Sequence, residues 1–306
     1  MHSLLLETDQ IHCYDQSGTR ISCKGTCQDA SFPKRLPYTD SRFQIQADTI
    51  LDTITGLLWS RDANPAGFPL TWEEAKAFVA GMTPPSSVSG YGAWQLPSRR
   101  MLFSLLSHQF CMPALPAGHP FTNVFSGYYW TGDSSSRFYS QAWRIDVGGA
   151  RVPRADKTDS SLVWPVSVST NALSAPDFHE WFIVSGSIVH DRLTGLIWSR
   201  DADIAGQLGW QQALDTLKRW NEEIRDGSNH WRLPNIRELE SLISLSDDSP
   251  ALPKEHPFYN VRDVYWSSTT SVYETRYAWA LYTRDGMVGV GFKSDGSFHL
   301  WSVRGS

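Results

Sequence analysis

The stretch TGLLWSRDAN at residues 55–64 returns as TGLIWSRDAD at residues 194–203, with eight of ten positions identical. The similarity continues downstream at a nearly constant spacing, which drifts from 139 residues to 136. Because the drift is so small, we interpret the chain as two tandem copies of one domain. The further matches are Trp72-Glu-Glu-Ala75 with Trp210-Gln-Gln-Ala213, Trp94-Gln-Leu-Pro97 with Trp231-Arg-Leu-Pro234, His119-Pro-Phe121 with His256-Pro-Phe258, and Tyr129-Trp130 with Tyr265-Trp266.

A repeat of this length has the size of an ordinary domain rather than of a solenoid unit. We therefore expect an N-terminal segment (residues 1–42), repeat 1 (residues 43–168), a linker (residues 169–181) and repeat 2 (residues 182–306). The N-terminal segment is polar and cysteine-containing, and we expect it to lie as an extended cover against repeat 1.

The composition is that of a globular protein, with 41% hydrophobic and 19% charged residues. A net charge of −5 without a run of Lys or Arg argues against nucleic acid as a partner. No stretch approaches the roughly 20 apolar residues that a membrane span requires. The apolar run at the start is too short for a signal peptide, so the protein either is cytosolic or has lost a leader.

Tryptophan is the most unusual feature of the composition, with 14 residues. Twelve of them form six pairs at equivalent positions of the two repeats. Large aromatic side chains retained in both copies favour a structural role in the core over a role as a ligand platform. The pairs that we assign to the scaffold are Trp59 and Trp198, Trp94 and Trp231, Trp130 and Trp266, and Trp143 and Trp279.

Three of the four cysteines, Cys13, Cys23 and Cys27, lie in the N-terminal segment. Asp15-Gln-Ser-Gly18 has the composition of a hairpin turn, which would place Cys13 and Cys23 on facing strands for a disulfide. Cys27 could then pair with Cys111. A zinc site from His12 and these three cysteines is the intracellular alternative, but its spacing fits no common zinc signature. We favour disulfides and hence an exported protein.

Each repeat opens with a predicted strand, turn and strand ending at Trp59 or Trp198. Apolar spacing then predicts an amphipathic helix from Trp72 or Trp210, with Thr71 as an N-cap. A second helix follows, capped by Ser98 in repeat 1 and by Asn235 with Glu238 in repeat 2. Alternating residues around Asp-Gly turns predict strands in the last third. The predicted fold class is α+β, with two helices packed on antiparallel β-sheet in each repeat.

The ordered motifs TGLIWSRDA, WRLPNIRELESLI, HPF, YWSST, YAWALYTRDG and VRG resemble the Lcl C-terminal-domain-like family, a bacterial domain. The resemblance covers both repeats, and repeat 2 is the better representative. It implies a C-type-lectin-like fold related to the formylglycine-generating enzyme, and a surface or periplasmic binding protein rather than an enzyme. The cysteine pair that holds copper in the formylglycine-generating relatives has no counterpart in either repeat.

Several candidate sites have a simpler structural explanation. His119 and His256 are repeated, but the flanking Pro and Phe indicate a loop latch rather than a base or a metal ligand. The Arg and Asp of the opening motif, and Arg232, Arg237 and Glu238, are expected to form internal ion pairs and caps. Asp285-Gly286 and Asp295-Gly296 could contribute to a calcium site, but turns explain them better. We expect no catalytic residues, no metal and no cofactor.

The C-terminal β-strands are where the two repeats differ most between fixed tryptophans. Variable loops on a rigid scaffold commonly carry binding function, and Tyr and Arg are frequent in recognition surfaces. We predict ligand contacts there in both repeats. The candidates are Arg137, Tyr139, Arg144 and Arg151 in repeat 1, and Tyr273, Glu274, Arg276, Tyr277, Arg284, Lys293 and His299 in repeat 2.

The leading hypothesis is an exported, non-enzymatic adhesin-type protein that binds a glycan or a protein surface through these hairpin loops. The first alternative is a variable ligand-binding protein diversified by a retroelement. The second is a metal-dependent oxidoreductase of the formylglycine-generating type.

Overall fold

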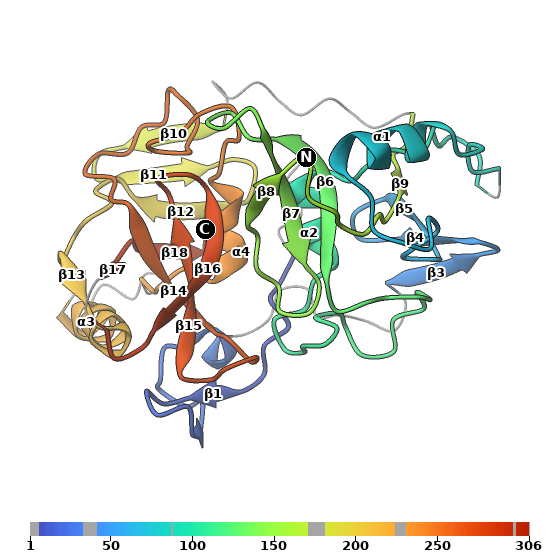
Figure 1. Cartoon of the computed structure of the whole chain (residues 1–306). Coiled ribbons are helices and arrows are strands. Elements are labelled where there is room, and N and C mark those ends of the chain that lie inside the picture. Colours follow the sequence, from blue (N-terminus) through green and yellow to red (C-terminus); the bar gives the residue numbers. More distant parts are fainter. Residues whose placement is uncertain are drawn as a thin grey trace. The chain divides into compact units, whose positions relative to one another are not determined.

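The structure, a computed structural model, describes residues 6–32, 42–86, 88–170, 181–223, 231–295 and 298–305. The chain divides into two compact units (Figure 1). One unit holds residues 37–174 and therefore repeat 1. The other is discontinuous and joins residues 1–36 to residues 175–306, which include repeat 2. Most of the predicted linker, residues 171–180, lies outside the described residues.

The first sheet of repeat 1 joins the beginning of the repeat to its end. The TGLLWS stretch forms a turn, in which Gly56 has a φ of 70°, followed by strand β5. The closing strand β9 pairs with β5 in antiparallel register, with Trp59 opposite Val166. Trp59 is fully buried and packs edge-on against Trp164 at 5.9 Å between ring centres. The sheet order is β3-β4-β5-β9, formed by Phe43–Gln46, Thr49–Asp52, Leu57–Ser60 and Val166–Ser167.

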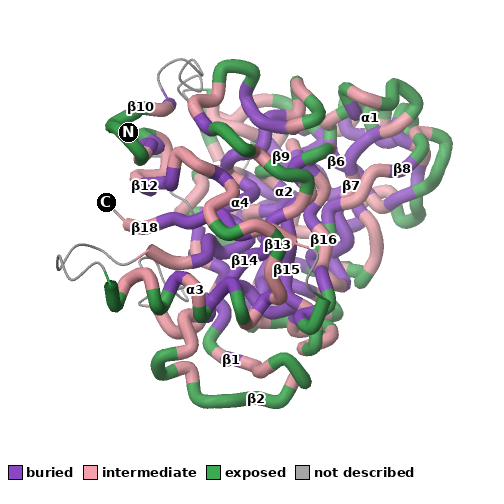
Figure 2. The backbone as a smooth tube through the Cα atoms, turned by 90° about the vertical axis from the view of Figure 1, so that its left-hand side faces the viewer, coloured by how far each residue is buried: buried purple, intermediate pink, exposed green. Residues whose placement is uncertain are grey.

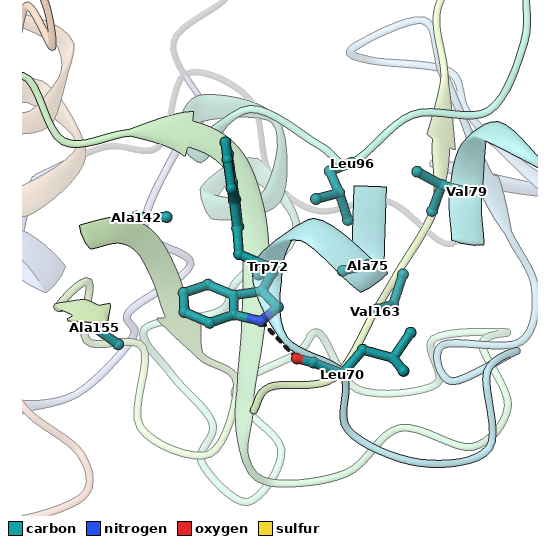
Figure 3. Packing of buried hydrophobic residues seen from close by; sticks show 9 residues of the cluster. Leu70, Trp72, Ala75, Val79, Leu96, Ala142, Ala155 and Val163 are labelled. Carbon is teal, nitrogen blue, oxygen red and sulfur yellow. Dashed lines mark hydrogen bonds between the residues drawn. The ribbon is translucent and has the colours of Figure 1, made fainter. Parts of the chain in front are cut away.

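The second sheet of repeat 1 has the order β6-β7-β8. Helix α1 begins at Trp72 after the predicted N-cap Thr71, which forms a capping box with Glu74. Its buried residues Trp72, Ala75 and Val79 belong to the hydrophobic cluster shown in Figure 3. The elements are α1 (Trp72–Ala80), α2 (Arg99–Leu105, capped by Ser98), β6 (Tyr128–Ser134), β7 (Gln141–Asp146) and β8 (Arg154–Asp156).

Repeat 2 has the same plan. Its first sheet has the order β10-β11-β12-β18, and Trp198 lies opposite Val303. Its second sheet has the order β13-β17-β14-β15-β16. The elements are β10 (Phe182–Ser185), β11 (Ile188–Asp191), β12 (Leu196–Ser199), β13 (Gln207–Leu208), α3 (Trp210–Glu223), α4 (Ile236–Ser241), β14 (Val264–Thr270), β15 (Tyr277–Tyr282), β16 (Met287–Phe292), β17 (Phe298–His299) and β18 (Val303–Gly305).

The predicted architecture is wrong, although the predicted helices form. The chain is 31% strand and 14% helix, arranged as several small antiparallel sheets rather than as lectin-like domains with two helices packed on one sheet. The four larger sheets have three to five strands each. The strands separate into two sheets per repeat because the last strand returns to the opening hairpin. Local patterns do not encode that long-range pairing.

The N-terminal segment packs against repeat 2, so its predicted position against repeat 1 is wrong. It contains strands β1 (Cys13–Tyr14) and β2 (Arg20–Ile21) and a short 3-10 helix, Asp29–Ser31. The predicted turn forms, with Gly18 at a φ of 84°. The hairpin lies beside β15 in both views (Figures 1 and 2). Residues 1–36 belong to the same compact unit as repeat 2.

Candidate functional site

Two exposed aromatic side chains of repeat 1 lie in the loop that joins β6 to β7. Tyr139 is 84% exposed and Phe138 is 44% exposed. The loop is held in place by its own hydrogen bonds: the Phe138 N–H donates to the Ser135 hydroxyl (3.1 Å), and the Gln141 N–H donates to the Phe138 carbonyl (2.8 Å). The two aromatic rings are therefore displayed on a loop of defined conformation.

Basic side chains surround this loop. The Arg137 guanidinium lies 5.4 Å from the centre of the Phe138 ring, and that of Arg154 lies 5.0 Å from it. Arg154 also lies 5.3 Å from the ring of Trp143. Exposed aromatic rings flanked by guanidinium groups can stack on a ligand and donate hydrogen bonds to it.

A lysine side chain that lies over a tryptophan ring belongs to the same surface. The Lys157 ammonium lies 4.5 Å from the centre of the Trp72 ring. The backbone fixes this contact, because the Trp72 N–H donates to the Lys157 carbonyl (3.0 Å) and the Lys157 N–H donates to the Ser140 carbonyl (2.8 Å). We call Trp72, Ser134, Phe138, Tyr139 and Lys157 the hairpin face of repeat 1.

The equivalent lysine of repeat 2 has the same support but a different environment. The Lys293 ammonium lies 4.2 Å from the centre of the Trp210 ring, and the Trp210 N–H donates to the Lys293 carbonyl (3.2 Å). Lys293 is fully buried and donates to the carbonyls of Tyr14 (3.3 Å) and Asp15 (3.2 Å). Burial lowers the pKa of Lys293 to about 7, while the charge of Asp15 opposes this shift.

Further contacts hold the N-terminal segment on repeat 2. Gln10 bonds the backbone of Thr270 twice, donating from Nε2 to the carbonyl (2.8 Å) and accepting from the N–H (3.0 Å). The Thr275 hydroxyl donates to the Gly18 carbonyl (2.8 Å). A side chain at Gly18 would collide with Thr275, since a Cβ there would lie 2.6 Å from its hydroxyl.

A carboxylate lies near the start of the second helix of each repeat, but it comes from different parts of the chain. In repeat 1, the Arg99 N–H at the start of α2 donates to Asp133. In repeat 2, the Ile236 N–H donates to the Thr269 hydroxyl (3.1 Å), which donates to Asp29 of the N-terminal segment (2.9 Å). The segment thus supplies a carboxylate that repeat 1 carries in its own sheet. Burial raises the pKa of Asp133, while its bond from the Arg99 N–H opposes this shift.

The predicted ligand residues of repeat 1 separate between the two ends of strand β7. Arg137 and Tyr139 lie in the β6–β7 loop. Arg151 follows the opposite end of β7 and pairs with Asp146 (2.9 Å). Arg144, on β7 itself, lies 4.1 Å from the Tyr128 ring and donates to the Ser161 hydroxyl (3.4 Å). Only Arg137 and Tyr139 therefore share the hairpin face's loop.

The predicted residues of repeat 2 also fall into several groups. Tyr273, Glu274 and Arg276 lie in the β14–β15 loop, where Tyr273 is 64% exposed and Arg276 pairs with Glu274 (3.0 Å). Tyr277 packs against Phe292 at the base of that loop. Arg284 is exposed beyond the far end of β15.

Lys293 adjoins that loop, since its N–H donates to the Arg276 carbonyl (3.0 Å), whereas His299 lies on β17. Lys293 is covered by the N-terminal segment, through its bonds to Tyr14 and Asp15. His299 pairs with Asp203 (3.0 Å), whose other carboxylate oxygen pairs with Arg262 (2.7 Å). Burial opposes the effect of these two partners, which together lower the pKa of Asp203.

Sequence reasoning missed Phe138 and Ser134 as members of the hairpin face. Lys157 and Lys293 occupy equivalent positions, 136 residues apart, and each follows an acidic or aromatic residue at the end of a strand. This repeated lysine is the signal that could have revealed the surface. No sequence signal marks Ser134, because it belongs to this surface through its backbone N–H and carbonyl rather than through its side chain.

The cysteine predictions are confirmed in part. Cys13 and Cys23 form the predicted disulfide, with their Cα atoms 5.2 Å apart. Cys27 and Cys111 are free thiols, so the suggested bond between them is wrong. Cys27 packs against the Trp210 and Trp266 cluster of repeat 2, and burial raises its pKa. Cys111 belongs to the other compact unit.

The motifs that the two repeats share build the scaffold. His256 stacks on Phe258, which packs edge-on against Trp301 at 4.7 Å. Arg232 and Glu238 form the predicted ion pair, with bonds of 2.7 and 2.6 Å. The Arg and Asp of the opening motif do not bond each other in repeat 2: Arg200 donates to the Pro257 carbonyl, and Asp201 accepts from Asn260.

Two matches to the family model of the Lcl C-terminal domain cover residues 48–167 and 187–304. The chain belongs to this family, in tandem. No curated protein sequence matches the chain. Within the described ranges, no three His, Cys, Asp or Glu side chains are placed to hold a metal ion. None of the helices in the described part of the chain is long and apolar enough to cross a membrane.

Proposed function

We propose that this tandem Lcl C-terminal-domain protein is an exported, non-enzymatic binding protein that recognises a glycan or a protein surface. The observation that carries the proposal is the β6–β7 loop of repeat 1. It displays Tyr139 and Phe138, whose ring has two guanidinium groups beside it, on a backbone held by its own hydrogen bonds. Such a surface can bind by aromatic stacking and charge-assisted hydrogen bonds without ordering a flexible loop first.

The Cys13–Cys23 disulfide supports export, because disulfides persist in oxidising compartments. The proposed binding requires neither a metal nor a cofactor, since stacking and hydrogen bonding from the loop suffice. Binding in EDTA should therefore equal binding in calcium-containing buffer. A loss of binding in EDTA would contradict this part of the proposal.

The test is a glycan array and a peptide array probed with the intact protein and with a Phe138→Ala, Tyr139→Ala double variant. The control is Ile45→Ala, which removes an exposed apolar side chain from β3 of the other sheet in the same unit. We expect the double variant to lose at least tenfold in affinity while the control keeps wild-type affinity. Equal binding by the double variant and the intact protein would overturn the assignment.

A further inference from the structure

The second sheets of the two repeats present the same backbone frame. The indole N–H of Trp72 donates to the Thr131 carbonyl (2.8 Å), and that of Trp210 donates to the Ser267 carbonyl (2.8 Å). Ser134 pairs with Ala142, and Thr270 pairs with Ala278, in the same register. Positions can therefore be compared one by one.

On repeat 2 this frame holds a piece of polypeptide. Gln10 bonds the outward N–H and carbonyl of Thr270, Lys293 donates to two successive carbonyls of a turn, and Thr275 donates to a third. As a result, Thr270 and Lys293 are both fully buried. Residues 8–29 thus pack against the end of β14 at Thr269 and Thr270.

On repeat 1 the same positions are open. Ser134 has the register of Thr270, so it turns the same N–H and carbonyl outward, and it is exposed. The Lys157 ammonium lies on Trp72 with no hydrogen-bond acceptor among the described residues. Tyr139 stands where Thr275 stands in repeat 2. The outward N–H and carbonyl of Ser134, together with the lysine beside the same sheet, are suited to binding a further peptide segment.

We propose that the hairpin face of repeat 1 binds a turn-containing polypeptide segment of a partner protein, in the way that repeat 2 holds residues 8–29. This deepens the proposed function by naming the ligand class and rests on it. The segment would present an amide, from Asn, Gln or the backbone, to Ser134. It would present the carbonyls of a turn to Lys157.

Charge decides against the N-terminal segment of a second copy as the occupant. In repeat 2, the segment's Asp29 lies against the neutral Thr269. In repeat 1, the equivalent position is Asp133, which already provides a carboxylate to the helix. A second buried carboxylate there would be strongly unfavourable. The bound segment therefore carries a neutral residue where residues 8–29 carry Asp29.

The test uses the intact protein and a fluorescent, C-terminally amidated peptide of residues 6–29, oxidised at Cys13 and Cys23, with Cys27→Ser and Asp29→Asn. We expect this peptide to bind at least tenfold more tightly than the same peptide with Asp29 retained. Lys157→Met in the intact protein should lower its affinity at least tenfold. The matched variant Lys293→Met should keep it, which would show that the peptide does not exchange into the repeat 2 site.

Absence of binding by the Asp29→Asn peptide at millimolar concentration would overturn this proposal. So would equal affinities for the Asp29→Asn peptide and for the peptide that retains Asp29. If the glycan array still gave binding that depends on Phe138 and Tyr139, the proposed function would stand and only the peptide ligand would be wrong. Absence of binding in both the array and the peptide assay would reject both proposals.

Discussion

The Lys293 ammonium lies 4.2 Å from the centre of the Trp210 ring and is closed off from solvent by residues 14 and 15. The equivalent pair in repeat 1, Lys157 and Trp72, has nearly the same separation, 4.5 Å, but no described segment of the chain accepts a hydrogen bond from that lysine. The two repeats therefore differ less in their scaffold than in what covers it.

Lys293 should make stability depend on pH. Its folded-state pKa, about 7, lies below its ordinary value of 10.5, so the unfolded chain binds more protons between these pH values. The free energy of unfolding should then rise with pH from 7 to 9, by up to about 1.4 kcal/mol per unit. Urea unfolding of the wild type and of Lys293→Met should show this rise only in the wild type. Lys157→Met should retain it, and a wild-type curve parallel to that of Lys293→Met would contradict the assignment.

Thr269→Asp should loosen the N-terminal segment. The substitution imitates Asp133 of repeat 1 and places a second carboxylate beside Asp29 in a buried position. Unpaired buried charge is costly, so we expect a destabilisation of about 3 kcal/mol. Hydrogen exchange should show loss of protection in residues 8–29. Adding Asp29→Asn should restore protection. If residues 8–29 exchange as fast in the double variant as in Thr269→Asp, the explanation is refuted.

Removing the Cys13–Cys23 disulfide should have a local effect. The bond closes a short loop and should stabilise the hairpin by about 3 kcal/mol. In Cys13→Ala, Cys23→Ala, limited proteolysis should cut near Asp15 and Gly18 while repeat 1 resists cleavage. Cys111→Ser, which alters a free thiol in the other unit, should leave the cleavage pattern unchanged. Equal cleavage of both units would show that the disulfide acts on the whole chain.

Arg232 and Glu238 should be strongly coupled. Their side chains are 15% and 5% exposed and bond through both carboxylate oxygens. Burial alone would lower the pKa of Arg232, but the Glu238 carboxylate raises it. Arg232→Gln should cost about 3 kcal/mol, since it leaves Glu238 buried without its partner.

Repeat 1 supplies the control for this pair, because Gln95 and Met101 occupy the equivalent positions. The double variant Arg232→Gln, Glu238→Met should therefore lose less stability than the sum of the two single variants. Thermal unfolding of the four proteins measures this coupling. Strict additivity would show that the pair does not act as a unit.

Local sequence patterns predicted those elements whose signals lie within a few residues. Thr71, and Asn235 with Glu238, cap helices as expected, because a cap involves only neighbouring backbone groups. The Cys13–Cys23 hairpin was predicted for the same reason. The candidate ligand residues share only polar or aromatic side chains and a place among the C-terminal strands. In the structure they lie at both ends of the second sheet. Residue type does not reveal which strand edge is left unpaired.

The sequence by itself determined that the chain is a tandem repeat of one family domain with tryptophans in its cores. Identity between copies survives wherever packing constrains the side chain, as at Trp59 and Trp198. Only the tertiary structure decided how the strands divide into sheets and which repeat the N-terminal segment covers. These depend on contacts between residues far apart in the chain, such as Gln10 with Thr270 and Asp29 with Thr269. Their free energy comes from buried hydrogen bonds that no local pattern records.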